Sequence, residues 1–186
     1  EGLDLVILTG DLGSANLMRK MAFEKIERKK QGLSEIKYSP QQEKKAFMEA
    51  YTSSMKIVKY LSKQLPVYII YGNVESSNAK TRKKSKKIKL TLPFLTDDLN
   101  ALDNVKVINN SLVDFNGVSI GGLEYFIDTC WVNEFKPNDY QKALKNAKKE
   151  TKKAQSVLKR FKEVDILVCH QPPYGVLDKV TNPHAP

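Results

Sequence analysis

Three short, mostly apolar runs, each followed by polar residues, stand out in the pattern of hydrophobic and polar positions along the chain. They cover residues 5–8, 67–71 and 165–169. Four or five apolar residues in succession are typical of a parallel strand that is buried on both faces. We therefore expect three such strands and an α/β fold in which polar residues leave the sheet at the strand ends.

The polar residues that follow these runs are candidates for chemistry. Asp11 follows the first run, Asn73 the second and His170 the third. If the three strands lie parallel in one sheet, these side chains reach the edge of the sheet where α/β proteins bind ligands. Two oxygen ligands and one imidazole nitrogen suit Mn, Fe or Zn better than Ca or Mg. The pattern predicts a metal site at Asp11, Asn73 and His170.

Each of these residues also has an ordinary structural alternative. Asp11 could be a turn or helix-start aspartate, Gly-Asn is a common turn dipeptide, and a lone buried histidine is more often a packed residue than a ligand. The segment after His170, Pro172-Pro173-Tyr174-Gly175, favours the ligand interpretation because it stiffens the adjacent loop. A catalytic metal site requires such fixed ligand geometry.

Helical periodicity predicts helices between the strands. Ser14 can cap a helix over about 15–30, and Ser39-Pro40-Gln41-Gln42 is a capped start for a second helix that reaches about residue 63. A short helix is expected within 92–102 and a long one over 139–163. The expected inward faces are Leu17, Met18, Met21, Ala22 and Ile26 in the first helix, and Tyr140, Ala143, Leu144, Ala147, Ala154, Leu158 and Phe161 in the last.

The middle of the chain predicts antiparallel pairing. Residues 105–108, 112–115 and 118–122 have strand character, and Asn116-Gly117 is a strong hairpin turn between the last two. Residues 121–136 are expected to be irregular. Lys80 to Lys89, with seven basic residues in ten, is expected to be a solvated loop.

Length and composition describe an ordinary globular protein. A chain of 186 residues most simply forms one domain, here 1–186, with a helical insertion about 31–64 and a basic loop about 76–91. No apolar run approaches the ~20 residues that a membrane span needs. Two cysteines do not make a disulfide framework, so we expect a cytoplasmic protein. The net charge of +10 favours phosphates and acidic partners, and admits a nucleotide or nucleic acid.

The three motifs together resemble those of the calcineurin-like metallophosphoesterases. They are Thr9-Gly10-Asp11, Gly72-Asn73-Val74-Glu75 and the segment from Cys169 to Gly175. The resemblance implies a two-sheet α/β sandwich with mixed sheets flanked by helices. It also implies hydrolysis of phosphomonoesters or phosphodiesters through a metal-activated water. Asp11 would bridge two divalent metal ions, Asn73 and His170 would bind the second, and Glu75 would hold the loop behind Asn73.

The sequence departs from the family pattern in two ways. The family usually has a histidine where Val74 stands, and that histidine contacts the substrate phosphate or protonates the leaving group. Valine can do neither, so the general acid is open and a non-catalytic protein-binding scaffold is the alternative function. The first family motif, Asp-x-His, would precede Glu1, and the last, Gly-His-x-His, would follow Pro186. We therefore expect a domain that is incomplete at both ends, and we do not equate His184 with the last motif.

Overall fold

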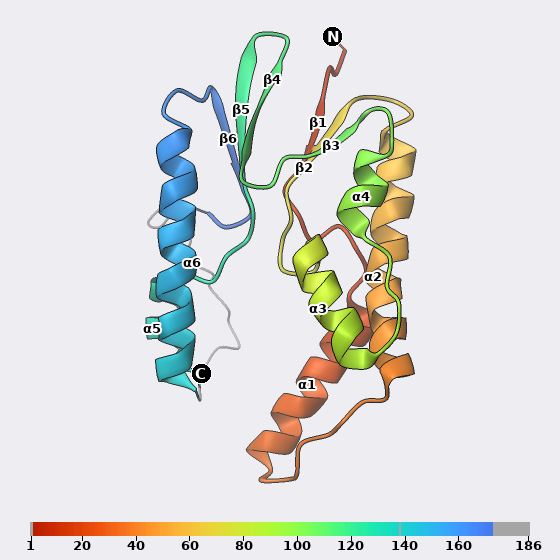
Figure 1. Cartoon of the computed structure of the whole chain (residues 1–186), viewed down its shortest axis with the longest axis vertical. Coiled ribbons are helices and arrows are strands. Elements are labelled where there is room, and N and C mark those ends of the chain that lie inside the picture. Colours follow the sequence, from red (N-terminus) through yellow and green to blue (C-terminus); the bar gives the residue numbers. More distant parts are fainter. Residues whose placement is uncertain (1, 138, 173–186) are drawn as a thin grey trace. The chain divides into compact units, whose positions relative to one another are not determined.

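The computed structural model describes residues 2–137 and 139–172, and it divides the chain into two compact units, Glu1–Val107 and Ile108–Pro186. Each unit contains its own three-stranded sheet (Figure 1). The first unit has β1 (Val6–Leu8), α1 (Asn16–Lys30), α2 (Pro40–Leu61), β2 (Val67–Ile69), α3 (Asn78–Ile88), α4 (Leu95–Asn100) and β3 (Val105–Val107). The second has β4 (Ser111–Phe115), β5 (Val118–Leu123), α5 (Thr129–Phe135), α6 (Tyr140–Arg160) and β6 (Ile166–Cys169).

The sheet of the first unit is parallel throughout, in the order β1-β2-β3. Val67 in the central strand pairs with Val6 on one side and Val105 on the other. The core of this unit joins β2 and β3 to helices α2 and α4, and its buried members are Met55, Val58, Val67, Ile69, Tyr71, Leu95, Leu99 and Val105. Because all three strands run in the same direction, their carboxyl ends share one edge of the sheet.

The sheet of the second unit is mixed. β4 and β5 form the predicted antiparallel hairpin, and β6 pairs with β5 in parallel. The turn residues Asn116 and Gly117 have φ angles of 53° and 84°, as a type I′ hairpin turn requires. The hairpin prediction is therefore confirmed. The condition that the three motif-bearing strands share one sheet is not met in the described residues, because β6 lies in a different sheet from β1 and β2. An apolar run predicts that a strand is buried, but it does not specify which strand it pairs with.

The predicted α/β class, with two sheets and flanking helices, is confirmed. That both units belong to a single domain stays a prediction. Within the described residues, no helix combines the length and the apolar character needed to cross a bilayer.

The start of α2 follows the predicted capping box. Ser39 Oγ accepts a hydrogen bond from Gln42 N at 3.2 Å, and Gln42 Oε1 accepts one from Ser39 N at 2.8 Å. The backbone N–H groups of Ser39 and Gln42 thus each have a side-chain acceptor. The predicted helix from Ser39 to about residue 63 is confirmed, with Pro40 as its first residue.

The start of α1 differs from the prediction, because Ser14 does not cap it. Ser14 Oγ instead donates to Glu49 Oε1 at 3.1 Å, and Glu49 Oε2 accepts from Leu17 N at 2.8 Å. A carboxylate is a stronger acceptor than a hydroxyl and interacts favourably with a helix N-terminus. Helix α1 is therefore capped by a residue of α2.

The expected apolar face of α1 is only partly covered. Leu17, Met18 and Met21 are half-buried, whereas Ala22 and Ile26 are exposed, and no residue of the helix is fully buried. The hydrogen bond from Leu17 N to Glu49 Oε2 joins the amino-terminal turn of α1 to α2. Helical spacing of apolar residues predicted the helix correctly but not how much of its face is covered.

The expected burial of the three motif-bearing strands holds only for β2. Val67 and Ile69 are fully buried, while all three residues of β1 are half-buried. In β6, Ile166 and Leu167 are 41% and 45% exposed. The difference follows from position in the sheet, because β2 is central and β1 and β6 are edge strands.

The basic segment expected to be a loop is helix α3. Ser77 precedes it and accepts a hydrogen bond from Lys80 N, and Thr81 and Ile88 are buried seven residues apart on one face. Lysine and arginine are good helix formers. Two buried contacts on one face therefore suffice to hold a helix in which most of the other positions are charged.

The segment 121–136 is also more regular than expected. β5 runs through Leu123, and α5 begins after Asp128, whose Oδ1 accepts from Trp131 N at 2.7 Å. The long helix α6 is confirmed. Its buried residues are Ala147, Ala154 and Val157, followed by the buried Phe161, whereas Leu158 is exposed. The inward face thus passes through Val157 rather than Leu158.

Tyr51 provides a test of the packing between α2 and α4. Its hydroxyl donates to Asp98 Oδ2 at 2.7 Å, and burial together with that acceptor raises the pKa of Tyr51 to about 12. The unfolded phenol ionises near its ordinary value of 10.0. The stability from this hydrogen bond is therefore fully present below pH 10.0 and is lost as pH rises through about 12.

We predict that Tyr51→Phe lowers the free energy of unfolding by about 1 kcal/mol near neutral pH, the typical net value of one hydrogen bond. The difference from wild type should shrink as pH rises from 10.0 towards 12. Urea unfolding across that pH range measures both quantities. The exposed Tyr60 of the same helix is the control, and a Tyr60→Phe variant with the same effect would contradict the assignment.

Candidate active site

Asp11 and Asn73 lie in neighbouring loops at the carboxyl edge of the first sheet. Asp11 follows β1 and Asn73 follows β2, and the last residues of these strands, Leu8 and Ile69, are register partners. Both side chains are exposed. The sequence therefore predicted correctly that these two residues leave adjacent strands at one edge of a sheet.

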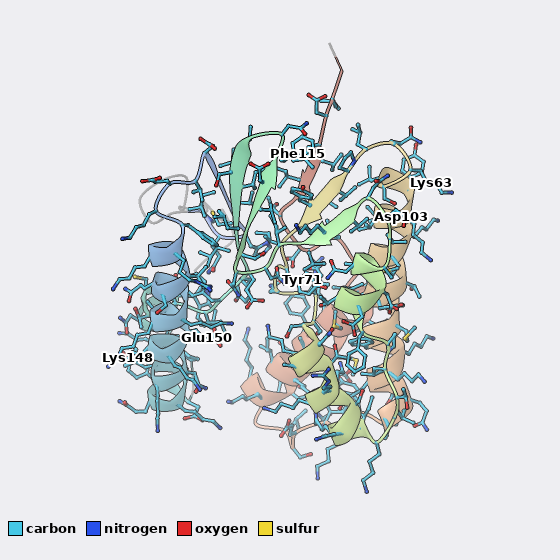
Figure 2. The ribbon with its side chains drawn as sticks, turned by 45° about the horizontal axis from the view of Figure 1, so that its top comes forward. Lys63, Tyr71, Asp103, Phe115, Lys148 and Glu150 are labelled. Atoms are coloured by element: carbon cyan, nitrogen blue, oxygen red, sulfur yellow. The ribbon has the colours of Figure 1, made fainter. Side chains whose placement is uncertain are left out.

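The two loops touch through their backbones at Gly10 and Gly72. Gly10 has a φ of +96°, and a Cβ added to it would lie 2.2 Å from the backbone nitrogen of Gly72. No side chain fits in that space, so glycine is required at position 10 by both conformation and contact. Tyr71, directly before Gly72, is buried and is labelled in Figure 2. Its hydroxyl lies 2.9 Å from Thr96 Oγ1 of α4.

The carboxylate of Glu75 joins the two loops. It is 4% exposed and accepts three backbone hydrogen bonds: from Gly72 N at 3.0 Å, Asp11 N at 2.8 Å and Leu12 N at 2.7 Å. Hydrogen bonds to a charged acceptor are stronger than those between neutral groups. The expected structural role of Glu75 is confirmed, and it extends to the loop of Asp11.

The Asp11 side chain reaches across to the second loop. Asp11 has a φ of 55°, and its Oδ1 accepts a hydrogen bond from Val74 N at 2.9 Å. Aspartate tolerates this left-handed conformation better than most residues. The carboxylate of Asp11 is therefore fixed beside the residue that follows Asn73.

Val74 is half-buried and lines a small cavity within the first unit. The cavity has a volume of about 30 Å³, enough for one water molecule, and its lining includes Phe47, Ser54 and Lys84. Burial lowers the pKa of Lys84, whose Nζ lies 5.7 Å from the centre of the Phe47 ring. Val74 thus contributes to packing behind the loop, in the position where the family usually has a histidine.

Helix α2 supports the Asp11 loop from behind. A Cβ added to Gly13 would lie 2.5 Å from the carbonyl oxygen of Ala50 and 2.6 Å from Ser54 Oγ. Ser14 N donates to Ser53 Oγ at 2.7 Å. The sequence analysis did not predict this contact. The pattern that indicates it is a group of small side chains, at positions 50, 53 and 54 of α2, that face a glycine.

His170 lies at the end of β6 in the second unit. It is half-buried, and its ring packs edge-on against Tyr125, with the ring centres 5.6 Å apart and the planes at 87°. Burial raises the pKa of the neighbouring Cys169 thiol. Because Asp11 and Asn73 belong to the first unit, their convergence with His170 stays a prediction. The expected stiff segment Pro173-Tyr174-Gly175 and His184 lie outside the described residues.

The first unit offers oxygen donors that suit a divalent cation. Asp11 supplies a carboxylate and Asn73 an amide oxygen, both exposed at loop ends that are fixed by hydrogen bonds. Such oxygens are typical ligands of divalent metals. Across residues 2–137 and 139–172, no three or more His, Cys, Asp and Glu side chains are gathered at metal-binding distance.

The family model of the calcineurin-like phosphoesterases matches residues 1–185, and the chain belongs to this family. A protein of known crystal structure shares the fold, with a TM-score of 0.52 and 10% sequence identity over 92% of this chain. The chain spans 60% of the length of that protein. A comparison with curated proteins gave no match. The family expected from the three motifs is thus confirmed.

The contact between the two loops can be tested at Gly10. We predict that Gly10→Ala lowers the free energy of unfolding by about 3 kcal/mol or more, because overpacking adds to the cost of a left-handed alanine. Gly32 is the matched control: its φ is +68°, and nothing lies within 4 Å of an added Cβ. Gly32→Ala should cost only about 1 kcal/mol. Equal losses in denaturant unfolding would show that the loops do not constrain each other.

Proposed function

We propose that the protein is a metal-dependent phosphoesterase that hydrolyses phosphomonoesters or phosphodiesters. Membership of the calcineurin-like phosphoesterase family supports a hydrolase of this class. The observation that carries the proposal is the pair of loops joined by Glu75, which presents Asp11 and Asn73 at the carboxyl edge of a parallel sheet. Ligands of α/β proteins bind at that edge.

The proposed ligand set is Asp11, Asn73 and His170, with Asp11 shared by two metal ions and Mn, Fe or Zn as the expected metals. Two bound metals would supply a polarised phosphoryl oxygen and a nucleophilic hydroxide. The described residues orient the proposed ligand Asp11. Glu75 fixes its backbone N–H, and Val74 N fixes its carboxylate. Such fixed geometry is what a catalytic metal site needs.

Val74 shapes the proposed chemistry. A valine side chain has no proton to donate, so it cannot protonate a departing oxygen. We therefore propose preference for esters whose leaving groups depart without protonation. A non-catalytic protein-binding scaffold on the same fold is the alternative, and Val74 is the residue that favours it.

The proposed partners follow from charge and the proposed compartment from the cysteines. The net charge of +10 supports an anionic substrate, including nucleotides or nucleic acid. Cys130 and Cys169 are both free thiols, which supports the cytoplasm.

The metal site can be tested by removing one charge from Asp11. Asparagine tolerates the φ of 55° and retains an oxygen for the Val74 N–H, so Asp11→Asn alters the charge with little effect on the loop. We predict that Mn²⁺ binding, measured by calorimetry, weakens about tenfold or more, and that Mn²⁺-dependent hydrolysis of a nitrophenyl phosphodiester falls in parallel. The control is Asp4→Asn, an exposed carboxylate on the amino-terminal side of β1. Equal binding by wild type and both variants would contradict the proposed ligand.

The effect of having Val74 where the family usually has a histidine can be tested by placing a histidine at this position. We predict that Val74→His raises kcat/KM for alkyl phosphodiesters much more than for nitrophenyl phosphodiesters, because a general acid typically contributes ~10²–10⁴-fold where protonation limits the rate. Val74→Leu controls for the larger side chain, and metal occupancy is matched in all forms. The same effect on both ester types would show that protonation is not limiting. No turnover by any metal-loaded form would favour the scaffold.

A further inference from the structure

An open groove lies along α3 and the segment that follows it, residues 90–94. It has a volume of about 400 Å³ and is lined by Arg82, Ser85, Lys86, Lys89, Thr91 and Phe94, together with two leucines. The groove lies entirely within the first unit. No acidic residue lines it.

Three cations line the groove from the carboxyl-terminal part of α3 and the residue after it. Arg82 and Lys86 lie four residues apart on one face of the helix, about 6 Å apart along its axis. Lys89 follows the helix with a φ of 55° and lines the same groove. Ser85 and Thr91 add hydroxyl donors to the same groove. The groove therefore presents a short row of positive charges with neutral donors beside them.

The acidic side chains of the helices packed on α3 make their hydrogen bonds and ion pairs with residues other than these three cations. Helices α2 and α4 contact α3 (Figure 1) and carry four acidic residues. Their partners are Lys87 for Glu43, Leu17 N and Ser14 for Glu49, the Asn78 amide for Asp97, and the Tyr51 hydroxyl for Asp98. None of these partners lines the groove.

Phe94 positions one of the cations. The Arg82 guanidinium lies 5.3 Å from the centre of the Phe94 ring, in cation–π contact. This contact holds the guanidinium at the groove, where its paired N–H donors match the oxygens of a phosphate group.

We propose that this groove binds a small oligophosphate, a molecule carrying two or more linked phosphate groups. Three cations and two hydroxyl groups that line one groove match several closely spaced phosphate charges. The groove is open to solvent, so a bound oligophosphate would be held mainly by the cationic and hydroxyl side chains along it. The proposal does not depend on the proposed hydrolase activity, because it concerns binding at a different set of residues.

The test is direct binding of inorganic tripolyphosphate to the purified chain, measured by calorimetry without added metal at about 0.15 M salt, where exposed charges are screened beyond ~8 Å. The groove variant is Lys86→Gln with Lys89→Asn. Asparagine is used at position 89 because Lys89 has a φ of 55°. The charge-matched control is Lys80→Gln with Lys83→Gln, two exposed lysines of α3 outside the groove.

We expect the groove variant to bind tripolyphosphate at least about tenfold more weakly than wild type, since each hydrogen bond to a charged group typically contributes enough for such a loss. The control variant should stay within about twofold of wild type, and citrate should bind much more weakly than tripolyphosphate. Circular dichroism checks that the total helix content of both variants matches that of wild type.

Four results would overturn the proposal. Equal losses in both double variants would show general attraction to a basic helix. Citrate binding as tight as tripolyphosphate would remove the preference for phosphate. Tighter binding of a single-stranded oligonucleotide, increasing with its length, would identify a nucleic-acid surface instead. Absence of tripolyphosphate binding by a folded wild-type chain would also reject the site.

Discussion

The buried carboxylate of Glu75 is the interaction on which the geometry of the candidate site depends. It accepts backbone hydrogen bonds from the loop after β1 and from the loop after β2, so neither loop takes its conformation alone. The close approach of Gly10 to Gly72 is possible only because these loops are drawn together. The carboxylate of Asp11 in turn accepts a hydrogen bond from Val74 N, and this bond fixes the orientation of the carboxylate. A single buried acceptor thus sets the position of two exposed candidate ligands.

Local sequence predicted those features that local physics determines. The capping box of Ser39 and the Asn116-Gly117 turn were both correct, because each is stabilised by contacts between residues close in the chain. The burial of β2 was also correct, since an apolar run in a central strand leaves no exposed face. For the candidate site, the glycine and carboxylate pattern around positions 10, 11, 72 and 75 was sufficient to predict two adjacent loops and a supporting role for Glu75.

The features that were predicted wrongly depend on partners distant in the sequence. Nothing in residues 166–169 specifies that β6 pairs with β5 rather than with β1 or β2. The basic segment of α3 is helical because Thr81 and Ile88 find buried contacts, and a run of charges conceals that pattern. Ser14 was a reasonable cap until Glu49, 35 residues away, supplied a stronger acceptor. In each case a tertiary contact overrides a local preference.

The capping of α1 by Glu49 has a consequence for how the first unit opens. Helix α1 has no fully buried residue, and Phe23 and Ile26 on it are largely exposed. Its amino-terminal turn is held mainly by the carboxylate of a neighbouring helix. Segments with few buried contacts exchange their amide hydrogens through local opening, well below the free energy of global unfolding. We therefore expect helix α1 to open locally more readily than α2 and the parallel sheet.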